Sequence, residues 1–111
     1  VRTKPEWEFV GIPDLTLFNK QTFFISWRLY PDMRINYDFE KEILQLRIKQ
    51  EDLIFSICRS GHRSQEAANY INKLGYKNCY NVSDGFEGYK DLGNHRAQVN
   101  GWKYNLLPWK Q

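Results

Sequence analysis

The sequence predicts an α/β domain in which helices cover a parallel sheet. Apolar runs of strand length alternate along the chain with segments of helical periodicity, and glycine, proline or acidic residues separate them. The resulting order of strand, helix, strand, helix, strand is typical of parallel sheets, because each parallel connection must cross over the sheet. A chain of 111 residues has the length of one domain.

The first half of the chain is expected to hold two helices and a strand. A short helix is predicted over residues 6–10, before Gly11. Residues 22–27 are mostly apolar, which is typical of a buried strand. A longer helix is predicted over residues 38–49, where apolar side chains recur at helical spacing, and Asn36 is a candidate N-cap.

The second half continues the alternation. Residues 53–57 are expected to form a second buried strand, and residues 79–82 a short third one. Between them, a helix is predicted over residues 64–74, with an apolar stripe along one face. Gly75 follows this helix directly, at the position where a left-handed residue commonly ends a helix.

Composition and charge exclude several classes of protein. Apolar residues make up 41% and charged residues 26% of the chain, values that exclude a disordered tail and a collagen-like fibre. The net charge of +3 is scattered along the chain, whereas a nucleic-acid binder usually carries a denser basic stripe. A nucleic-acid partner is therefore not expected.

The cysteine count and the hydropathy pattern favour the cytoplasm. No apolar run approaches the roughly 18 residues needed to cross a bilayer, so no membrane partner is expected, and the amino end does not resemble an export signal. Cys58 and Cys79 are too few for a disulfide framework and favour a reducing compartment. The cysteines and histidines are too dispersed for a zinc site, so no metal is expected. Cys79 is expected to be a structural residue of its strand.

The turn Cys58-Arg-Ser-Gly-His-Arg-Ser64 has the clearest chemical content. It lies between the carboxyl end of a predicted strand and the amino end of a predicted helix, where open parallel sheets bind ligands. Inward-pointing N–H groups, the helix dipole and two arginines would stabilise a thiolate at Cys58. We therefore expect its pKa to lie well below the free value of about 8.5. Gly61 allows the positive φ that such a turn requires.

The same turn could hold an anionic sulfur donor. Arg59 and Arg63 could neutralise the oxygens of thiosulfate while the Cys58 thiolate attacks the outer sulfur. Sulfite would leave, and the Cys58 persulfide would pass its sulfur to a thiol or to cyanide. This scheme requires no general base, because the nucleophile is already ionised, and no cofactor is expected. The candidate substrate-binding residues are Arg59, Ser60, Gly61, His62, Arg63 and Ser64.

Two residues of the turn have simpler interpretations. His62 is expected to contribute its backbone N–H and to expose its ring, and a role of that ring in acceptor binding is the alternative. Ser64 is most simply the N-cap of the following helix, with a contact to the bound anion as a secondary role.

The turn resembles the active-site loop of the rhodanese (thiosulfate sulfurtransferase) family. The resemblance implies a five-stranded parallel sheet flanked by helices, with Cys58 as the persulfide carrier. It also implies that residues 1–111 form a single domain whose first strand is trimmed at the amino end. Bacterial single-domain members have a similar tail. The matching segments are Val1-Arg2-Thr3, Glu6-Trp7, Ala67-Ala68, Leu74-Gly75-Tyr76, Asn81-Val82, Asp84-Gly85, Gly101-Trp102-Lys103 and Leu107-Pro108-Trp109.

The length of the loop separates the activities known on this fold. Four residues stand between Cys58 and Arg63, as in sulfurtransferases, whereas the related phosphatases have one more. Arginine directly after the cysteine resembles the thiosulfate-using branch. A phosphatase or arsenate reductase is thereby disfavoured. The alternative that stays open is a non-catalytic or protein-loaded module, used for sulfur relay or for docking a partner.

Overall fold

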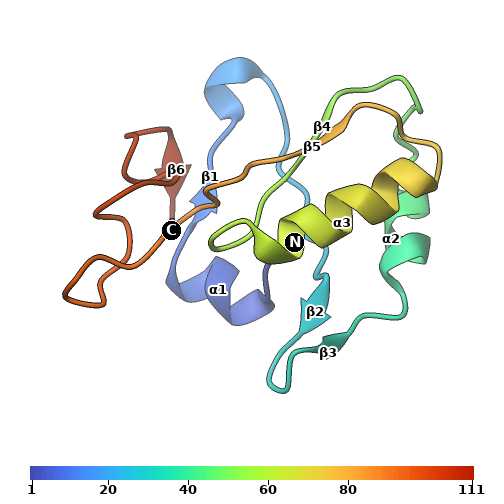
Figure 1. Ribbon diagram of the computed structural model, residues 1–111. Helices are drawn as coiled ribbons and strands as arrows, with labels where there is room; N and C mark the ends of the chain where they lie inside the picture. Colours follow the sequence, from blue (N-terminus) through green and yellow to red (C-terminus); the bar gives the residue numbers. More distant parts are fainter.

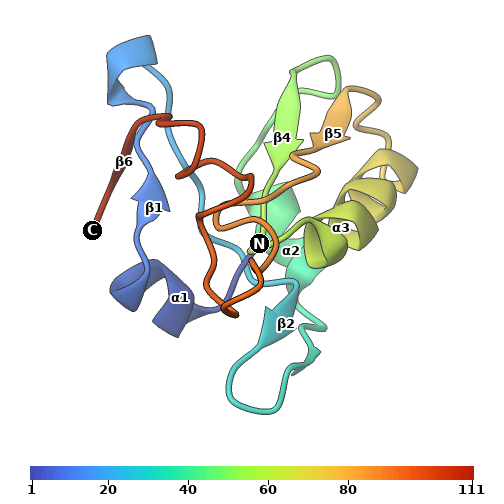
Figure 2. The ribbon, with the colours of Figure 1, turned by 60° about the vertical axis from the view of Figure 1, so that its left-hand side comes forward.

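One helix packed on a parallel pair of strands forms the centre of the fold. In the computed structural model, which describes residues 1–111, β4 (Ile54–Ser56) pairs in parallel with β5 (Cys79–Asn81). The connection between them contains α3 (His62–Lys73), which packs against both strands (Figures 1 and 2). The prediction of two strands joined by a helix is thus confirmed for this part of the chain, but the expected burial of the first strand is not, because Leu53 and Phe55 are exposed.

The two faces of this strand pair differ in their environment. Ser56 and Cys79 are buried, whereas Phe55 and Tyr80, which neighbour them along the strands, are 63% and 53% exposed. This alternation follows from the two-residue period of a strand, which sends successive side chains to opposite faces. Helix α3 covers the face that carries Ser56 and Cys79. The residues that follow β4 lead into the amino end of this helix.

Helix α3 begins earlier than the sequence predicts and ends close to the predicted position. The helix begins at His62, two residues before the predicted start, and Gly61 is its N-cap with a φ of +103°. The interpretation of Ser64 as the N-cap is therefore wrong. Gly75 has a φ of +108° just after the helix, which confirms the prediction of a left-handed residue there.

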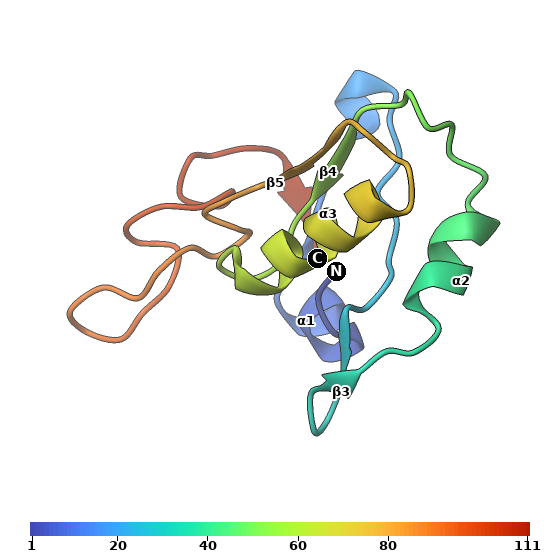
Figure 3. The same ribbon diagram turned by 45° about the vertical axis from the view of Figure 1, so that its right-hand side comes forward.

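The segment that follows the first helix pairs with the carboxyl-terminal segment of the chain. Helix α1 (Lys4–Phe9) leads into β1 (Ile12–Pro13), which pairs antiparallel with β6 (Trp109–Lys110). Figure 2 shows this pair apart from β4 and β5, with a short 3₁₀ helix, η1 (Thr16–Phe18), beyond β1. Beyond β5 the chain is mostly loop, and this long segment projects away from α3 (Figure 3).

A five-stranded parallel sheet is not confirmed by the structure. The strands form three separate pairs, and only β4 with β5 is parallel. Residues 22–27, predicted as a strand, have no regular strand structure. Single hydrogen bonds still align three segments, because Trp27 N–H donates to the Val1 carbonyl (3.2 Å) and the Val1 nitrogen donates to the Ile57 carbonyl (2.8 Å). A single backbone hydrogen bond between neighbouring segments aligns them but does not form the repeated hydrogen-bond pattern of a β-sheet.

The segment between the predicted strand and β4 forms a hairpin and a short helix. β2 (Arg28–Leu29) and β3 (Arg34–Ile35) pair antiparallel, and α2 (Phe39–Gln45) follows, beside α3 (Figure 3). The helix predicted over residues 38–49 is therefore real but shorter. It ends early because Arg47 adopts a left-handed φ of +55°, which an α-helix cannot accommodate.

The apolar core joins α2, α3 and β5. Phe39 of this core makes an edge-to-face contact with Trp27, with ring centroids 4.8 Å apart. The eight buried residues of the core cluster are Ile25, Phe39, Ile43, Ala67, Ala68, Ile71, Tyr76 and Cys79.

None of the helices has the length and apolar character needed to cross a bilayer.

Candidate active site

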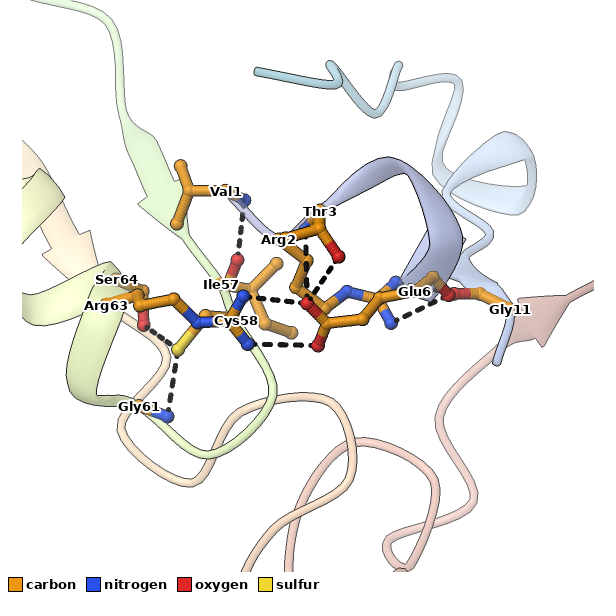
Figure 4. Close-up of polar contacts among 10 residues, drawn as sticks. All are labelled: Val1, Arg2, Thr3, Glu6, Gly11, Ile57, Cys58, Gly61, Arg63 and Ser64. Atoms are coloured by element: carbon orange, nitrogen blue, oxygen red, sulfur yellow. Dashed lines mark hydrogen bonds and ion pairs between the residues drawn. The ribbon is translucent and has the colours of Figure 1, made fainter. Parts of the chain in front are cut away.

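The turn after β4 closes around the sulfur of Cys58. Cys58 is only 1% exposed, and its Sγ accepts hydrogen bonds from the backbone N–H of Gly61 at 3.1 Å and from the hydroxyl of Ser64 at 3.2 Å (Figure 4). Both donors come from the amino end of α3, where the helix dipole also favours negative charge. The turn therefore forms a small cup that stabilises an anion at its centre.

The electrostatics of the cup favour the thiolate form of Cys58. Burial by itself raises the pKa of this thiol, because it disfavours the charged form. Hydrogen bonds from the hydroxyl and N–H of Ser64 and from the N–H groups of Gly61 and Ser60 outweigh burial, and the pKa lies below its ordinary value. At Cys79 burial is the cause of the shift, and it raises the pKa of that thiol to about 11.

A second loop, after β5, supports the cup from outside. The N–H of Phe86 donates to the carbonyl of Cys58 (2.8 Å), and those of Glu87 and Gly88 donate to the carbonyl of Arg59 (2.9 and 3.1 Å). These bonds use the turn's carbonyl groups on the outer side. Its N–H groups are left to face inward, toward the sulfur.

The two loops approach so closely that glycine is required on both. A Cβ added at Gly61, whose φ is +103°, would overlap the carbonyl oxygen of Ser83. A Cβ added at Gly85, whose φ is +73°, would overlap the carbonyl oxygen of Arg59. The two glycines therefore determine how tightly the loop after β5 holds the cup.

Arg63 is held inside the fold by a carboxylate from α1. Its guanidinium binds Glu6 with both Nη atoms, at 2.7 and 2.9 Å, and the two side chains are 14% and 19% exposed (Figure 4). Glu6 also accepts hydrogen bonds from the N–H and hydroxyl of Thr3, as the third residue of a capping box. Burial alone would raise its pKa, but the bonds from Arg63 and Thr3 lower the pKa of Glu6 to about 2.

The two arginines of the turn thus have different environments. Figure 4 shows the Arg63 guanidinium between the Cys58 sulfur and the Glu6 carboxylate, so its charge is already partly compensated. Arg59 is exposed and takes part in no ion pair. The prediction that both arginines face an incoming anion stays a prediction: Arg59 is exposed, and Arg63 lies beside the Cys58 sulfur.

The remaining residues of the turn lie where their backbones can contribute. Ser60 is buried, and His62, the first residue of α3, is exposed. The hydroxyl of Ser64 is fully buried and bonds to the Cys58 sulfur and to Oδ1 of Asn81 (2.5 Å). Cys58 to Gly61 thus form the turn, whereas His62, Arg63 and Ser64 are the first three residues of α3.

Three polar residues around the cup carried no assigned role in the sequence interpretation. Glu6 follows Thr3 by three residues, the spacing of a capping box, and this signal was present in the sequence. Asn81 ends β5, beside the strand that leads to the cup. Arg2 is 1% exposed, donates to the Gly11 carbonyl (2.5 Å) and lies 4.3 Å from the centre of the Phe86 ring. The residues around Arg2 in the sequence give no signal that its side chain is buried against Phe86.

The state of Cys58 can be measured directly. We expect thiolate absorbance at about 240 nm to appear in a titration step below pH 8.5, the ordinary value for a free cysteine. The step should disappear in Cys58→Ser and persist in Cys79→Ala, because burial raises the pKa of Cys79 to about 11. A first step above pH 8.5 would contradict the described cup.

Comparisons with known proteins agree with this geometry. Residues 1–92 match the family model described as Rhodanese-like domain. The uncharacterized protein RC0915 of Rickettsia conorii is 50% identical over 111 residues, which cover 99% of this chain and 79% of that protein. Thiosulfate sulfurtransferase GlpE of Tolumonas auensis is 34% identical over 53 residues, covering 48% of this chain and 50% of that protein.

A solved structure has the same fold along the whole chain. The crystal structure of Rv0390 from M. tuberculosis matches with a TM-score of 0.89 and 40% sequence identity, covering 100% of this chain and 80% of that chain. The turn around Cys58, the fold and the sequence comparisons lead to the same conclusion: the chain belongs to the rhodanese-like domain family.

Proposed function

We propose that the protein is a sulfurtransferase that carries sulfane sulfur on Cys58, taken from thiosulfate or a similar anionic donor. The observation that supports this most is the hydrogen bonding of the buried Cys58 sulfur, at 3.1 Å from the Gly61 N–H and 3.2 Å from the Ser64 hydroxyl. Family membership supports sulfur transfer in general terms. The donor is inferred from the loop.

The reaction is a double displacement. The Cys58 thiolate attacks the outer sulfur of thiosulfate, the bond between the two sulfur atoms of thiosulfate breaks, and sulfite leaves with the bonding electrons. The persulfide carries one negative charge, as the thiolate did. A thiol or cyanide then attacks the outer sulfur of the persulfide, and the Cys58 thiolate is released unchanged.

The cup residues would stabilise the charge at each stage. The N–H groups of Ser60 and Gly61 and the hydroxyl of Ser64 face the sulfur that is attacking or leaving. Arg59, which is exposed, and Arg63, which lies beside the Cys58 sulfur, would bind the sulfonate oxygens of the donor. His62 would contribute through its backbone at the start of α3, with its exposed ring outside the cup.

We further infer that residues 1–111 act as one domain. The ion pair between Glu6 and Arg63 joins residues 57 positions apart, and the pairing of β1 with β6 joins residues 12–13 to residues 109–110. Both cysteines are free thiols, which supports a reducing compartment and so the cytoplasm.

The test is an intact-mass measurement on the protein before and after incubation with thiosulfate. We expect the gain of one sulfur atom, and the loss of this atom when cyanide or a thiol is added. Cys58→Ser should not gain sulfur, whereas Cys79→Ala should gain it like the unchanged protein, because a buried thiol with a pKa of about 11 is protonated at neutral pH.

Two outcomes would contradict the proposal. Sulfur gained equally by Cys58→Ser would move the chemistry to another residue. No gain in a folded protein with reduced Cys58 would favour the alternative of a module that is loaded by another protein or that only docks a partner.

A further inference from the structure

The Ser64 hydroxyl faces two acceptors but has only one proton. Its oxygen lies 3.2 Å from the Cys58 sulfur and 2.5 Å from Oδ1 of Asn81, and Ser64 is fully buried. A hydroxyl donates one hydrogen bond at a time. Since water has no access to this group, the two acceptors compete for the same proton.

The neighbours of Asn81 determine which end of its amide faces Ser64. Nδ2 of Asn81 donates to the carbonyl of Gly61 at 3.1 Å and to Oε1 of Gln65 at 3.3 Å. A backbone carbonyl can only accept, so the NH₂ group must point to Gly61. Oδ1 therefore faces Ser64 and can act there only as an acceptor.

We propose that Asn81 is a positioning residue that competes with the Cys58 sulfur for the proton of the Ser64 hydroxyl. The inference deepens the proposed function, on which it rests, because it says how the reactivity of the persulfide carrier is adjusted. Asn81 acts through Ser64 and touches neither the donor nor the sulfur that moves.

The competition gives the two protonation states of Cys58 different hydrogen bonds. In the thiol state, the S–H donates to the Ser64 oxygen and the Ser64 hydroxyl donates to Asn81, so every group has a partner. In the thiolate state, the Ser64 proton can turn to the sulfur only by leaving Oδ1 of Asn81 without a donor. Asn81 therefore stabilises the thiol relative to the thiolate, and also the uncharged sulfur that follows nucleophilic attack.

The experiment is a titration of Cys58 by thiolate absorbance at about 240 nm, which requires no sulfur transfer. We expect Asn81→Ala to lower the pKa of Cys58 by about half a unit to one unit, the shift that one neutral hydrogen bond typically produces. Asn81→Asp, of nearly the same size, should raise this pKa, because a carboxylate accepts the Ser64 proton more strongly and adds negative charge.

Two controls separate competition from loosening of the loop. In a Ser64→Ala background, Asn81→Ala should leave the pKa of Cys58 unchanged within about 0.2 units, since no shared proton remains. Gln65→Ala removes another partner of the Asn81 amide without touching Ser64, and should not alter the pKa. Circular dichroism on each variant checks that it is folded.

The outcomes decide between the two explanations. If Asn81→Ala raises the pKa or leaves it unchanged, or lowers it equally in the Ser64→Ala background, the proposal is wrong. If Asn81→Ala does not fold, an unchanged pKa in Asn81→Asp would overturn it. The predicted pKa pattern without any sulfur loading of Cys58 would overturn the proposed function while this inference stands.

Discussion

Replacement of Gly61 by alanine is expected to reduce the rate of sulfur loading on Cys58 at least tenfold. The new Cβ would overlap the carbonyl oxygen of Ser83, on a backbone whose φ of +103° already disfavours any side chain. Either the turn or the supporting loop must shift. The turn carries the N–H that donates to the Cys58 sulfur at 3.1 Å, so that bond is disturbed in both cases. Loss of a single donor of this kind typically slows catalysis by about 10²–10³.

The same substitution should lower the free energy of unfolding by about 2–4 kcal/mol, because it combines backbone strain with a clash against backbone atoms. Urea unfolding and the intact-mass assay measure the two effects separately. Gly75→Ala is a matched control: its φ is +108°, but its Cβ would meet only the flexible side chain of Gln50, at 2.9 Å. It should destabilise the protein by about 1–2 kcal/mol with loading unchanged. Equal loading by the two variants would contradict the described cup.

Replacement of Glu6 by glutamine is expected to destabilise the protein by roughly 3 kcal/mol at pH 7. The carboxylate accepts two bonds from Arg63, at 2.7 and 2.9 Å, in a site where both side chains are mostly buried. Removal of its charge breaks the ion pair with the guanidinium of Arg63, which typically costs about 3–5 kcal/mol for a buried pair. Glutamine retains part of the hydrogen bonding, so we expect the lower end of this range.

The pH dependence of stability identifies the carboxylate as the cause. The folded state lowers the pKa of Glu6 to about 2, so its contribution is fully present above the unfolded value of about 4.3 and is lost as the pH falls through the folded value. The difference in unfolding free energy between the native protein and Glu6→Gln should therefore shrink as the pH falls from 7 toward 2.

Urea unfolding at several pH values measures this difference. Glu8→Gln serves as the control on the same helix, because Glu8 is exposed and pairs with Lys4 only at 3.8 Å. It should change stability by less than about 0.5 kcal/mol. A difference for Glu6→Gln that does not vary with pH would contradict the role given to the ion pair.

Local patterns in the sequence predicted the part of the fold that carries the site. The strand-length runs before Cys58 and at Cys79, and the glycine at position 75, correspond to β4, β5 and the end of α3. The turn itself was recognised from residue types over seven consecutive positions. Each of these features depends on backbone conformation and side-chain periodicity within about a dozen residues, so a single sequence contains the necessary information.

The failures concern features that depend on distant parts of the chain. Residues 22–27 are as apolar as a strand, yet only Trp27 among them has a backbone bond to Val1. A strand requires a partner along its length, and apolar character does not supply one. The carboxylate partner of Arg63 was also missed, because Glu6 binds it across 57 positions and no pattern near Arg63 indicates such a distant residue.

The sequence alone determined that a cysteine lies in a tight, basic, glycine-containing turn at the start of a helix, which is sufficient to predict a stabilised thiolate. Only the tertiary structure decided which polar groups surround that turn. It placed Glu6 of α1 on Arg63, and Asn81 of β5 on the hydroxyl of Ser64. The physical reason is range: backbone donors within a turn are brought together by local φ and ψ angles, whereas side chains from α1 and β5 reach the turn only after the whole chain has packed.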